Sequence, residues 1–356
     1  MTDSNHQSAL SKEQIDSVIE LYSNGQYQEA IDQIKFLNTS YPNVPLLFNL
    51  VGACYKALGQ LEVAVRMFEK AVSIKPDYTE AHKNLGITLK DLGKLDAAIK
   101  SLKQSIVVDS NYVDAHFNLA ITFKDFGNLD AAVKSYEKTI ALNPNFAEAH
   151  NNLGNVFKDL DRLDDAIKSY ERAIALNPNF AEAHNNLGNV FKDLDRLDDA
   201  IKSYERAIAL NPNFAEAYYS LGNVFKDLDR LDDAIIRYEK AIIIRPNYHQ
   251  ALINLGFALM NLRRLDEAII SFKKAIIIKP DNAEVHNYLG NALNILGNIK
   301  AGVKCYEKAI AINPNFAEAY FSLGNVFKKL KQRDKALLCF ERAREIKPDM
   351  DFILGD

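Results

Sequence analysis

The feature that most constrains this chain is an internal repetition with a period of 34 residues. Residues 147–180 read AEAHNNLGNVFKDLDRLDDAIKSYERAIALNPNF, and residues 181–214 repeat that string letter for letter. Further copies begin at residues 45, 79, 113, 215, 249, 283 and 317, and a weaker copy begins at residue 11. Self-similarity at this period predicts an array of ten stacked repeats rather than a globule.

Each repeat carries the spacing of two amphipathic helices. Leu153 and Phe157 stand four residues apart on one face of the first helix, and Tyr170 follows Ala166 by four residues in the second. A polar stretch separates the two helices. Pro178 cannot extend a helix, so it predicts the end of the second one.

A glycine recurs inside the first helix of nearly every repeat. The positions equivalent to Gly154 are occupied by Gly52, Gly86, Gly188, Gly222, Gly256, Gly290 and Gly324. Glycine inside a helix is less favourable than alanine by about 0.5–1 kcal/mol, so its recurrence needs a compensating gain. We expect that gain to be a close approach of the two helix backbones.

Seven residues sit at the spacing of a known family in most repeats, with single departures such as Ala120, Ser110 and Leu102. In repeat 147, named by its first residue, they are Leu153, Gly154, Phe157, Ala166, Tyr170, Ala173 and Pro178. This pattern resembles the tetratricopeptide repeat (TPR). The resemblance implies an all-α, right-handed superhelical solenoid of about ten helix-turn-helix repeats over residues 11–350, with the first helices lining a concave groove.

The two ends of the chain depart from the pattern. Residues 1–10 are polar, so we expect them to be disordered, and repeat 11 is interpreted as an N-terminal cap. Residues 351–356 leave no room for the capping helix that a solenoid needs. We expect these last residues to be a truncated continuation or a linker to a following domain.

Composition and charge restrict which classes of binding partner and which cellular compartment are predicted. The formal net charge is -4 and opposite charges are interspersed, which argues against a nucleic-acid partner. The N-terminus lacks a secretory signal and no apolar run approaches a membrane span. Cys54, Cys305 and Cys339 form neither a disulfide framework nor a CxxC pair. These features favour a cytoplasmic protein without a membrane partner.

Catalytic, metal and cofactor chemistry is not predicted. Five histidines share one place in their repeats: His82, His116, His150, His184 and His286. Equivalent residues of adjacent repeats lie about 10 Å apart, whereas zinc needs nitrogens within about 2.1 Å, so these histidines are interpreted as packing residues. The chain also lacks the phosphate-loop, HExxH, GxSxG and GxGxxG motifs. We therefore expect no catalytic, metal or cofactor site and no enzyme activity in this chain.

Asparagines mark one face of the first helices. One column lies two residues before the glycine and comprises Asn84, Asn118, Asn152, Asn186 and Asn254. The other candidates are Asn151, Asn155, Asn185, Asn189 and Asn223. Asparagine is a poor helix former, but its carboxamide both donates and accepts, as a peptide unit does. We expect these amides to bind the main chain of an extended protein segment.

We call the column of Asn84, Asn118, Asn152, Asn186 and Asn254 the asparagine ladder, and its peptide-binding interpretation has two alternatives. Leu50, Ser220, Tyr288 and Ser322 interrupt the column, and asparagine could instead be a soluble filler carried along by recent duplication. The arrangement is similar to the ladder in the repeat arm of O-GlcNAc transferase-like glycosyltransferases. That resemblance implies a substrate-recognition arm whose catalytic domain is absent from these residues. Four aromatic residues at groove positions predict apolar selection: Tyr219, Phe257, Tyr288 and Phe321.

Isoleucines distinguish the outer surface of two second helices. Ile236 and Ile243 are seven residues apart, as are Ile270 and Ile277. Each pair shares a helix face, and together they predict an apolar patch large enough for an interface. The patch favours a homo-oligomer, a partner on the convex side or a self-assembling structural rod. Extra packing between repeats and a covering helix are the remaining interpretations.

Overall fold

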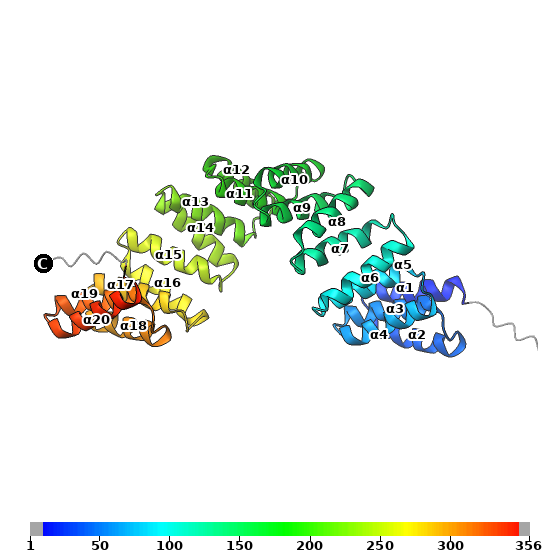
Figure 1. Ribbon diagram of the computed structural model, residues 1–356, viewed down its shortest axis with the longest axis horizontal. Coiled ribbons are helices and arrows are strands. Elements are labelled where there is room, and N and C mark those ends of the chain that lie inside the picture. The colour runs from blue at the N-terminus through cyan, green and yellow to red at the C-terminus, as the bar shows by residue number, and fades with distance from the viewer. Residues whose placement is uncertain (1–9, 349–356) are drawn as a thin grey trace, which may run out of the picture. The chain divides into compact units, whose positions relative to one another are not determined.

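The computed structural model describes residues 10–348, in which the regular structure consists of 20 helices and no strand. The chain divides into two compact units, Met1–Pro178 and Asn179–Asp356. Within each unit the helices follow one another as antiparallel pairs in chain order (Figure 1). The predicted fold class, an all-α solenoid of helix-turn-helix repeats, is confirmed.

The N-terminal unit contains the first five helix pairs. They are α1 Lys12–Ser23, α2 Tyr27–Ser40, α3 Pro45–Ala57, α4 Leu61–Ile74, α5 Thr79–Asp91, α6 Leu95–Val108, α7 Val113–Asp125, α8 Leu129–Leu142, α9 Ala147–Asp159 and α10 Leu163–Leu176.

The C-terminal unit contains the other five pairs within the described residues. They are α11 Ala181–Asp193, α12 Leu197–Leu210, α13 Ala215–Asp227, α14 Leu231–Ile244, α15 His249–Asn261, α16 Leu265–Ile278, α17 Ala283–Ile295, α18 Ile299–Ile312, α19 Ala317–Lys329 and α20 Arg333–Ile346.

The turn inside each repeat needs one residue with a left-handed backbone. Five repeats place glycine there: Gly25, Gly59, Gly93, Gly127 and Gly297. The other five place an L-residue there at φ between 57° and 60°: Asp161, Asp195, Asp229, Arg263 and Lys331. Glycine adopts this conformation without a steric penalty, so the turns differ in strain although their geometry is the same.

Within each unit the first helices lie nearer to one another than the second helices do. Direct contacts between first helices join α3 to α5, α5 to α7, α11 to α13, α13 to α15 and α17 to α19. The described second helices make no comparable contacts with one another. The first helices therefore form the inner side of each unit, and the faces of the second helices that point away from them form the outer side.

The recurring glycines are explained by side chains rather than by a backbone approach. A Cβ on Gly154 would lie 2.7 Å from Cε1 of Tyr170, and one on Gly256 would lie 2.5 Å from Cε1 of Phe272. The expected backbone approach is therefore wrong at these glycines. A flat ring from the second helix occupies the space of the missing side chain. Among the glycines of residues 10–348, only Gly302, in a second helix, has a backbone atom as its nearest neighbour, the carbonyl oxygen of Gly290 at 3.1 Å.

The first repeat shares a core cluster with α3, which contributes Leu47, Val51 and Cys54. Val18, Ile31 and Ile34 are fully buried there, and Leu10 packs against them. Ser11 begins α1 with a capping box, because its side chain accepts from the N–H of Gln14 and the Gln14 side chain accepts from the N–H of Ser11. Leu10 is the last residue of the segment that we expect to be disordered. Residues 1–9 and 349–356, including the predicted continuation, lie outside the described residues.

Candidate functional site: amides on the inner side

A buried tyrosine positions the asparagine that follows the glycine. The Tyr170 hydroxyl donates to Oδ1 of Asn155 at 2.7 Å, and the Tyr238 hydroxyl donates to Oδ1 of Asn223 at 2.8 Å. The same bond joins Tyr204 to Asn189 at 2.8 Å and Tyr306 to Asn291 at 2.9 Å. Burial raises the pKa of all four hydroxyls above the ordinary tyrosine value, so each stays protonated and keeps donating.

In the C-terminal unit this bond extends into a network. Asn254 donates from Nδ2 to Oδ1 of Asn223 at 2.8 Å and to the Tyr219 hydroxyl at 3.3 Å. The Oδ1 of Asn223 thus accepts from both Tyr238 and Asn254. These bonds leave the Nδ2 group of Asn223 as a donor and Oδ1 of Asn254 as an acceptor for a ligand. Together they match the C=O and N–H of one peptide unit.

The amides of the N-terminal unit have more varied partners. Asn84 donates from Nδ2 to Oδ1 of Asn49 at 3.0 Å, which links α5 to α3. Asn118 instead donates to the backbone oxygen of Asp114 in its own helix at 2.8 Å. The five asparagines of the predicted ladder column are each half-buried, so their side chains are accessible but not arranged as equal rungs.

Two predicted groove residues lie elsewhere than expected. Asn151 is 6% exposed and Asn185 is 7% exposed, so both are buried instead of sharing an open face with their neighbours. Asn151 donates from Nδ2 to Oδ1 of Asn152 at 3.3 Å and thereby supports a ladder residue. Oδ1 of Asn185 is among the buried polar atoms without a hydrogen-bond partner.

Cavities lie along the first helices of both units. One of about 430 Å³ in the N-terminal unit is lined by residues that include Asn49 and Asn84. One of about 550 Å³ in the C-terminal unit lies over α17 and α19 and is lined by Asn291, Asn294, Tyr306, Ser322, Asn325, Lys328 and Lys329. Both cavities open on amide-bearing faces, so the inner side offers hollowed surface next to the asparagines.

Aromatic side chains form separate groups of contacting rings in the C-terminal unit. The ring centroid of Phe257 lies 4.2 Å from that of Tyr288 and 5.8 Å from that of Phe272. Tyr219 lies 6.0 Å from Tyr238 and packs on the following turn. The predicted groove aromatics Tyr219, Phe257, Tyr288 and Phe321 are all half-buried, so part of each ring is presented to solvent.

Ion pairs run along the edge of the inner side. Lys56 bridges to Asp91 at 3.1 Å, and Lys124 bridges to Asp159 at 3.2 Å, each joining one repeat to the next. These pairs are partly exposed, so each contributes at most about 1 kcal/mol. In the last repeat, Lys329 stands at the position equivalent to Asp91 and Asp159. That end of the C-terminal unit is therefore locally basic.

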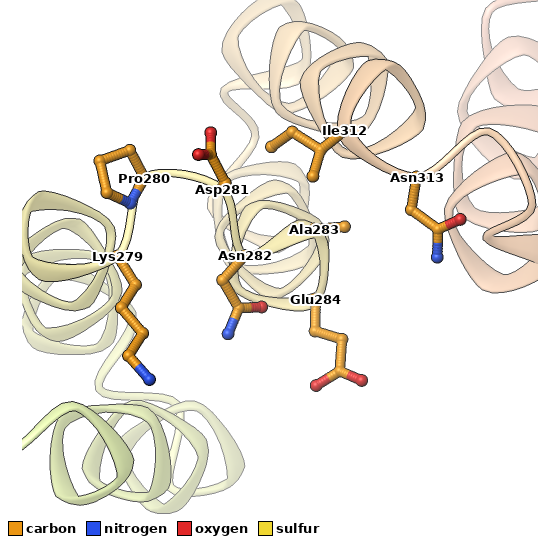
Figure 2. A pocket seen from close by; sticks show the side chains of 8 residues that line it. All are labelled: Lys279, Pro280, Asp281, Asn282, Ala283, Glu284, Ile312 and Asn313. Carbon is orange, nitrogen blue, oxygen red and sulfur yellow. The ribbon is translucent and has the colours of Figure 1, made fainter. Parts of the chain in front are cut away.

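A further cavity of about 650 Å³ lies at the turn between α16 and α17 (Figure 2). Figure 2 shows Lys279, Asn282 and Glu284 on one side of the turn and Asp281 on the other. Asn282 begins α17 by accepting from the N–H of Val285 at 3.2 Å. None of the predicted ladder residues lines this cavity, so it is separate from the amide-bearing faces.

The recurring histidines contact backbone oxygens of the turns between repeats. Nε2 of His82, His150 and His286 lies 2.8, 3.2 and 2.9 Å from the oxygen of the proline six residues earlier. In His116 the partner is the Ser110 oxygen at 3.0 Å. These contacts agree with the structural interpretation of the histidine column. Residues 10–348 hold no group of three or more ligating side chains suited to a metal ion.

The cysteines are free thiols in protected surroundings. Cys54 is buried, and Cys305 and Cys339 are partly buried. Burial raises the pKa of the Cys54 thiol to about 11, and it raises that of Cys305 and Cys339 as well. A thiol with a raised pKa is a poor nucleophile, so none of the three is poised for chemistry.

The predicted isoleucine patch is exposed on the outer side of the C-terminal unit. Ile236 and Ile243 of α14 are 56% and 71% exposed, and Ile270 and Ile277 of α16 are 54% and 78% exposed. Within the C-terminal unit, over residues 179–348, neither extra packing between repeats nor a covering helix buries these side chains.

Comparison with protein families identifies the repeat. The family described as "TPR repeat" matches residues 88–127, 122–161, 154–195, 188–229, 264–294 and 290–331. The chain belongs to the tetratricopeptide repeat family. Two related descriptions, both "Tetratricopeptide repeat", match residues 317–350 and residues 47–78 and 215–248. Membership supports a protein-interaction scaffold.

Several solved structures resemble parts of the chain. A structure titled "Functional Characterization of Pseudomonas Aeruginosa pilF" is 20% identical, with a TM-score of 0.53, over 60% of this chain and 97% of that one. YrrB, titled a TPR protein with an unusual peptide-binding site, is 24% identical, with a TM-score of 0.47, over 52% of this chain and 96% of its own. MamA is 34% identical, with a TM-score of 0.43, over 47% and 97%. No curated protein matches.

Two further observations bear on the site. No helix among residues 10–348 combines the length and the apolar character needed to cross a membrane.

The sequence pattern did not lead us to predict the tyrosine–asparagine bond, although a signal was present. Tyrosine stands 15 residues after asparagine in repeats 147, 181, 215 and 283.

Proposed function

We propose that this TPR protein is an interaction scaffold that binds extended protein segments through their main chain on the inner side of each unit. The observation that carries the proposal is the bond network of Tyr238, Asn223 and Asn254. It fixes one amide as a donor and the next as an acceptor. A ligand therefore meets amides whose orientation is already fixed, which lowers the entropy lost on binding.

The chemistry of the inner side favours main chain over side chains. An extended peptide presents a carbonyl and an N–H at each residue, and a carboxamide can satisfy either. Such contacts do not depend on ligand sequence, so many segments could bind with modest affinity. Each neutral hydrogen bond contributes about 0.5–1.5 kcal/mol, so several must act together.

The group of rings around Phe257 and Tyr288 adds a preference for apolar ligand residues in the C-terminal unit. Phe257 and Tyr288 present ring surface where the neighbouring repeat presents amides. Aromatic side chains contribute most of the binding energy at many interfaces. The C-terminal unit should therefore select an apolar residue within an otherwise sequence-tolerant segment.

The test begins with a probe of defined chemistry. Random peptides displayed on phage are selected on the wild-type chain, and the selected peptide is titrated calorimetrically. Asn223→Ala with Asn254→Ala should weaken binding about 10- to 30-fold, since two hydrogen bonds of about 1 kcal/mol each are lost. Asn152→Ala with Asn186→Ala probes the identical repeats in the same way.

The matched control is Asn247→Ala, an exposed turn residue of the same repeat as Asn223. Its affinity should equal that of the wild type. Unchanged affinity in both double variants would remove the amides from the binding surface and contradict the proposal. The narrower hypothesis of a glycosyltransferase substrate arm uses the same surface and is tested by the same variants together with a search for transferase activity in the native protein.

A further inference from the structure

The cavity over α17 and α19 differs in charge from two other cavities of the chain. Its seven lining residues are three asparagines, two lysines, a serine and a tyrosine, and none of them is acidic. The cavity lined by Asn49 and Asn84 includes Glu80, and the cavity at the turn between α16 and α17 includes Asp281 and Glu284. The α17–α19 cavity therefore carries positive charge that no carboxylate of its own lining balances.

The positive charge comes from lysines at positions that other repeats fill with aspartate. Residues 158–165 of repeat 147 carry four acidic and two basic side chains, whereas residues 328–335 of repeat 317 carry five basic and one acidic. Lysine replaces aspartate at three equivalent positions: Lys329 for Asp159, Lys331 for Asp161 and Lys335 for Asp165. Helices α9 and α19 both have 13 residues and end at the first of these positions, so the helix itself does not require a lysine there.

An ion pair that joins neighbouring repeats elsewhere is replaced at this cavity. Lys124 of repeat 113 pairs with Asp159 of the next repeat at 3.2 Å. The two equivalent positions at the cavity hold Asn294 and Lys329, and both side chains line it. Lys329 is exposed and forms no ion pair with a carboxylate among residues 179–348. Its ammonium group is therefore available to an anion from outside the chain.

The neutral side chains of the cavity add hydrogen-bond donors. The Tyr306 hydroxyl donates to Oδ1 of Asn291 at 2.9 Å, so the Nδ2 group of Asn291 is the end that remains for a ligand. The Ser322 hydroxyl can donate as well. Lys328 and Lys329 contribute two cations from the last turn of α19. A set of cations and oriented N–H and O–H donors favours an anion with several acceptor oxygens over a neutral ligand.

From this donor set and the lining without acidic residues, we propose that the cavity binds a phosphorylated serine or threonine of the extended segment. A phosphate monoester carries a charge of about −1.5 to −2 and three acceptor oxygens, so it can engage two lysines and an amide together. A carboxylate has a single charge and two oxygens, which leaves part of the donor set unmatched. The inference rests on the proposed function, because the segment bound on the inner side brings the phosphate to the cavity. Phosphorylation of the segment thereby strengthens its binding to the C-terminal unit.

A blocked amino acid tests the cavity apart from the main-chain contacts, because it is too short to reach Asn223 and Asn254 as well. Acetyl-phosphoserine methylamide is titrated with the full chain and followed by phosphorus NMR, with an expected dissociation constant on the order of 1 mM. Lys329→Asp gives α19 the last residue of α9 and should weaken binding at least about tenfold. Lys308→Asp makes the same charge change at an exposed position of α18 outside the cavity and should leave binding unchanged. Acetyl-glutamate methylamide, measured by displacement of the phosphoserine, should bind at least about tenfold more weakly.

A phosphate scan of a bound peptide tests whether the segment itself carries the phosphate. The peptide selected on the wild-type chain is lengthened at each end by a short Gly-Ser linker, and serine or phosphoserine is placed at each position in turn. At one position phosphoserine should bind at least about tenfold more tightly than serine, and Lys329→Asp should abolish that ratio without changing the affinity of the serine peptide. Asn223→Ala with Asn254→Ala should weaken both peptides equally and preserve the ratio, so a failure of the main-chain contacts is distinguished from a failure of the phosphate site.

Four results contradict the inference. Blocked phosphoserine that does not bind at about 20 mM, or that binds Lys329→Asp as tightly as the wild type, would overturn it. Equal binding of acetyl-glutamate methylamide would show that the cavity accepts any acidic group. A peptide that gains affinity from phosphoserine at no position would show that the segment does not deliver the phosphate.

Discussion

Repeats 215 and 249 are neighbours in the chain. Each exposes two isoleucines at equivalent positions of its second helix, yet the inner sides of the two repeats differ. In repeat 215 Tyr238 covers the glycine and donates to Asn223 at 2.8 Å. In repeat 249 Phe272 covers the glycine, and the centroid of its ring lies 5.8 Å from that of Phe257. The repeat whose covering ring has a hydroxyl has Asn223 after its glycine, and the repeat whose covering ring lacks one has Phe257 there.

The same association holds across most of the chain. Asparagine follows the glycine above Tyr170, Tyr204, Tyr238 and Tyr306. Where the covering residue is Phe68, Leu102 or Phe272, the residue after the glycine is apolar. A buried hydroxyl needs a hydrogen-bond partner, and an amide next to it supplies one. The ring packs beneath the glycine, and in four repeats its hydroxyl bonds to the asparagine that follows the glycine.

Tyr136 is a buried tyrosine whose own repeat has no asparagine after the glycine position. Ile121 follows the position of the missing glycine in that repeat. Burial raises the pKa of Tyr136, while a hydrogen bond with Asn152 of the next repeat opposes part of that rise. The Tyr136 hydroxyl therefore bonds to Asn152, the ladder asparagine of the next repeat. In repeat 317 Phe340 accompanies Asn325, which nothing in the structure explains.

The largest effect should come from removing the ring. Tyr238→Ala and Phe272→Ala should each lower the free energy of unfolding by about 3–5 kcal/mol, since each leaves a cavity beneath a glycine. Urea titration followed by circular dichroism measures both. Equal losses would show that the ring stabilises both repeats alike. The exposed Lys240→Ala should change stability by less than about 0.5 kcal/mol; a loss below about 1 kcal/mol for either ring would contradict the account.

A methyl group on the glycine should also distinguish the two repeats. A Cβ on Gly222 would lie 2.7 Å from Tyr238, and one on Gly256 would lie 2.5 Å from Phe272. Overpacking of about 1–3 kcal/mol should exceed the gain of about 0.5–1 kcal/mol from alanine in a helix. Thermal unfolding should rank Gly256→Ala as the less stable variant. Stabilisation by either change would show that the ring does not need the glycine.

Exchanging the hydroxyl tests the comparison directly. Tyr238→Phe should lower stability by about 1 kcal/mol through the lost hydrogen bond to Asn223. Phe272→Tyr should also destabilise, because its hydroxyl would face Phe257. Adding Phe257→Asn should recover about 1 kcal/mol, the coupling expected of a tyrosine–asparagine pair in a double-mutant cycle. Zero coupling would mean that hydroxyl and amide occur together without interacting.

The smallest effect should come from the turns of the same two repeats. Arg263 has φ of 60° and Asp229 has φ of 58°. Arg263→Gly should stabilise by about 0.5–1 kcal/mol, since removing the left-handed strain outweighs the entropy of the unfolded glycine. Asp229→Gly should gain less, because aspartate tolerates this conformation better. A larger gain at Asp229 in the same melting experiment would reverse that explanation.

Periodicity was sufficient to predict the fold. The 34-residue repeat and the spacing of Leu153, Tyr170 and Pro178 predicted paired helices, and α9 and α10 end at Asp159 and Leu176 as that spacing requires. A residue that recurs every 34 positions meets the same neighbours each time, so one repeat explains the others. Exposure of the outer isoleucines followed from the same spacing.

The details of the inner side depend on contacts that spacing does not contain. Asn151 and Asn155 share a helix face, but the first is buried and the second is only half-buried. The bond from Tyr170 to Asn155 joins two helices, so it depends on ring orientation and helix approach. The purpose of Gly154 was misjudged for the same reason, because the size of the covering side chain decides how close the backbones come.

The central claim is that the inner side recognises peptide main chain, and backbone methylation of a bound peptide tests it most directly. A peptide selected on the wild-type chain is resynthesised with one N-methyl amide at each position in turn, and each version is titrated calorimetrically. The account predicts that methylation at several positions lowers affinity about tenfold or more, while most side-chain truncations to alanine change it less. Tolerance of methylation at every position, with affinity lost on side-chain truncation instead, would contradict it.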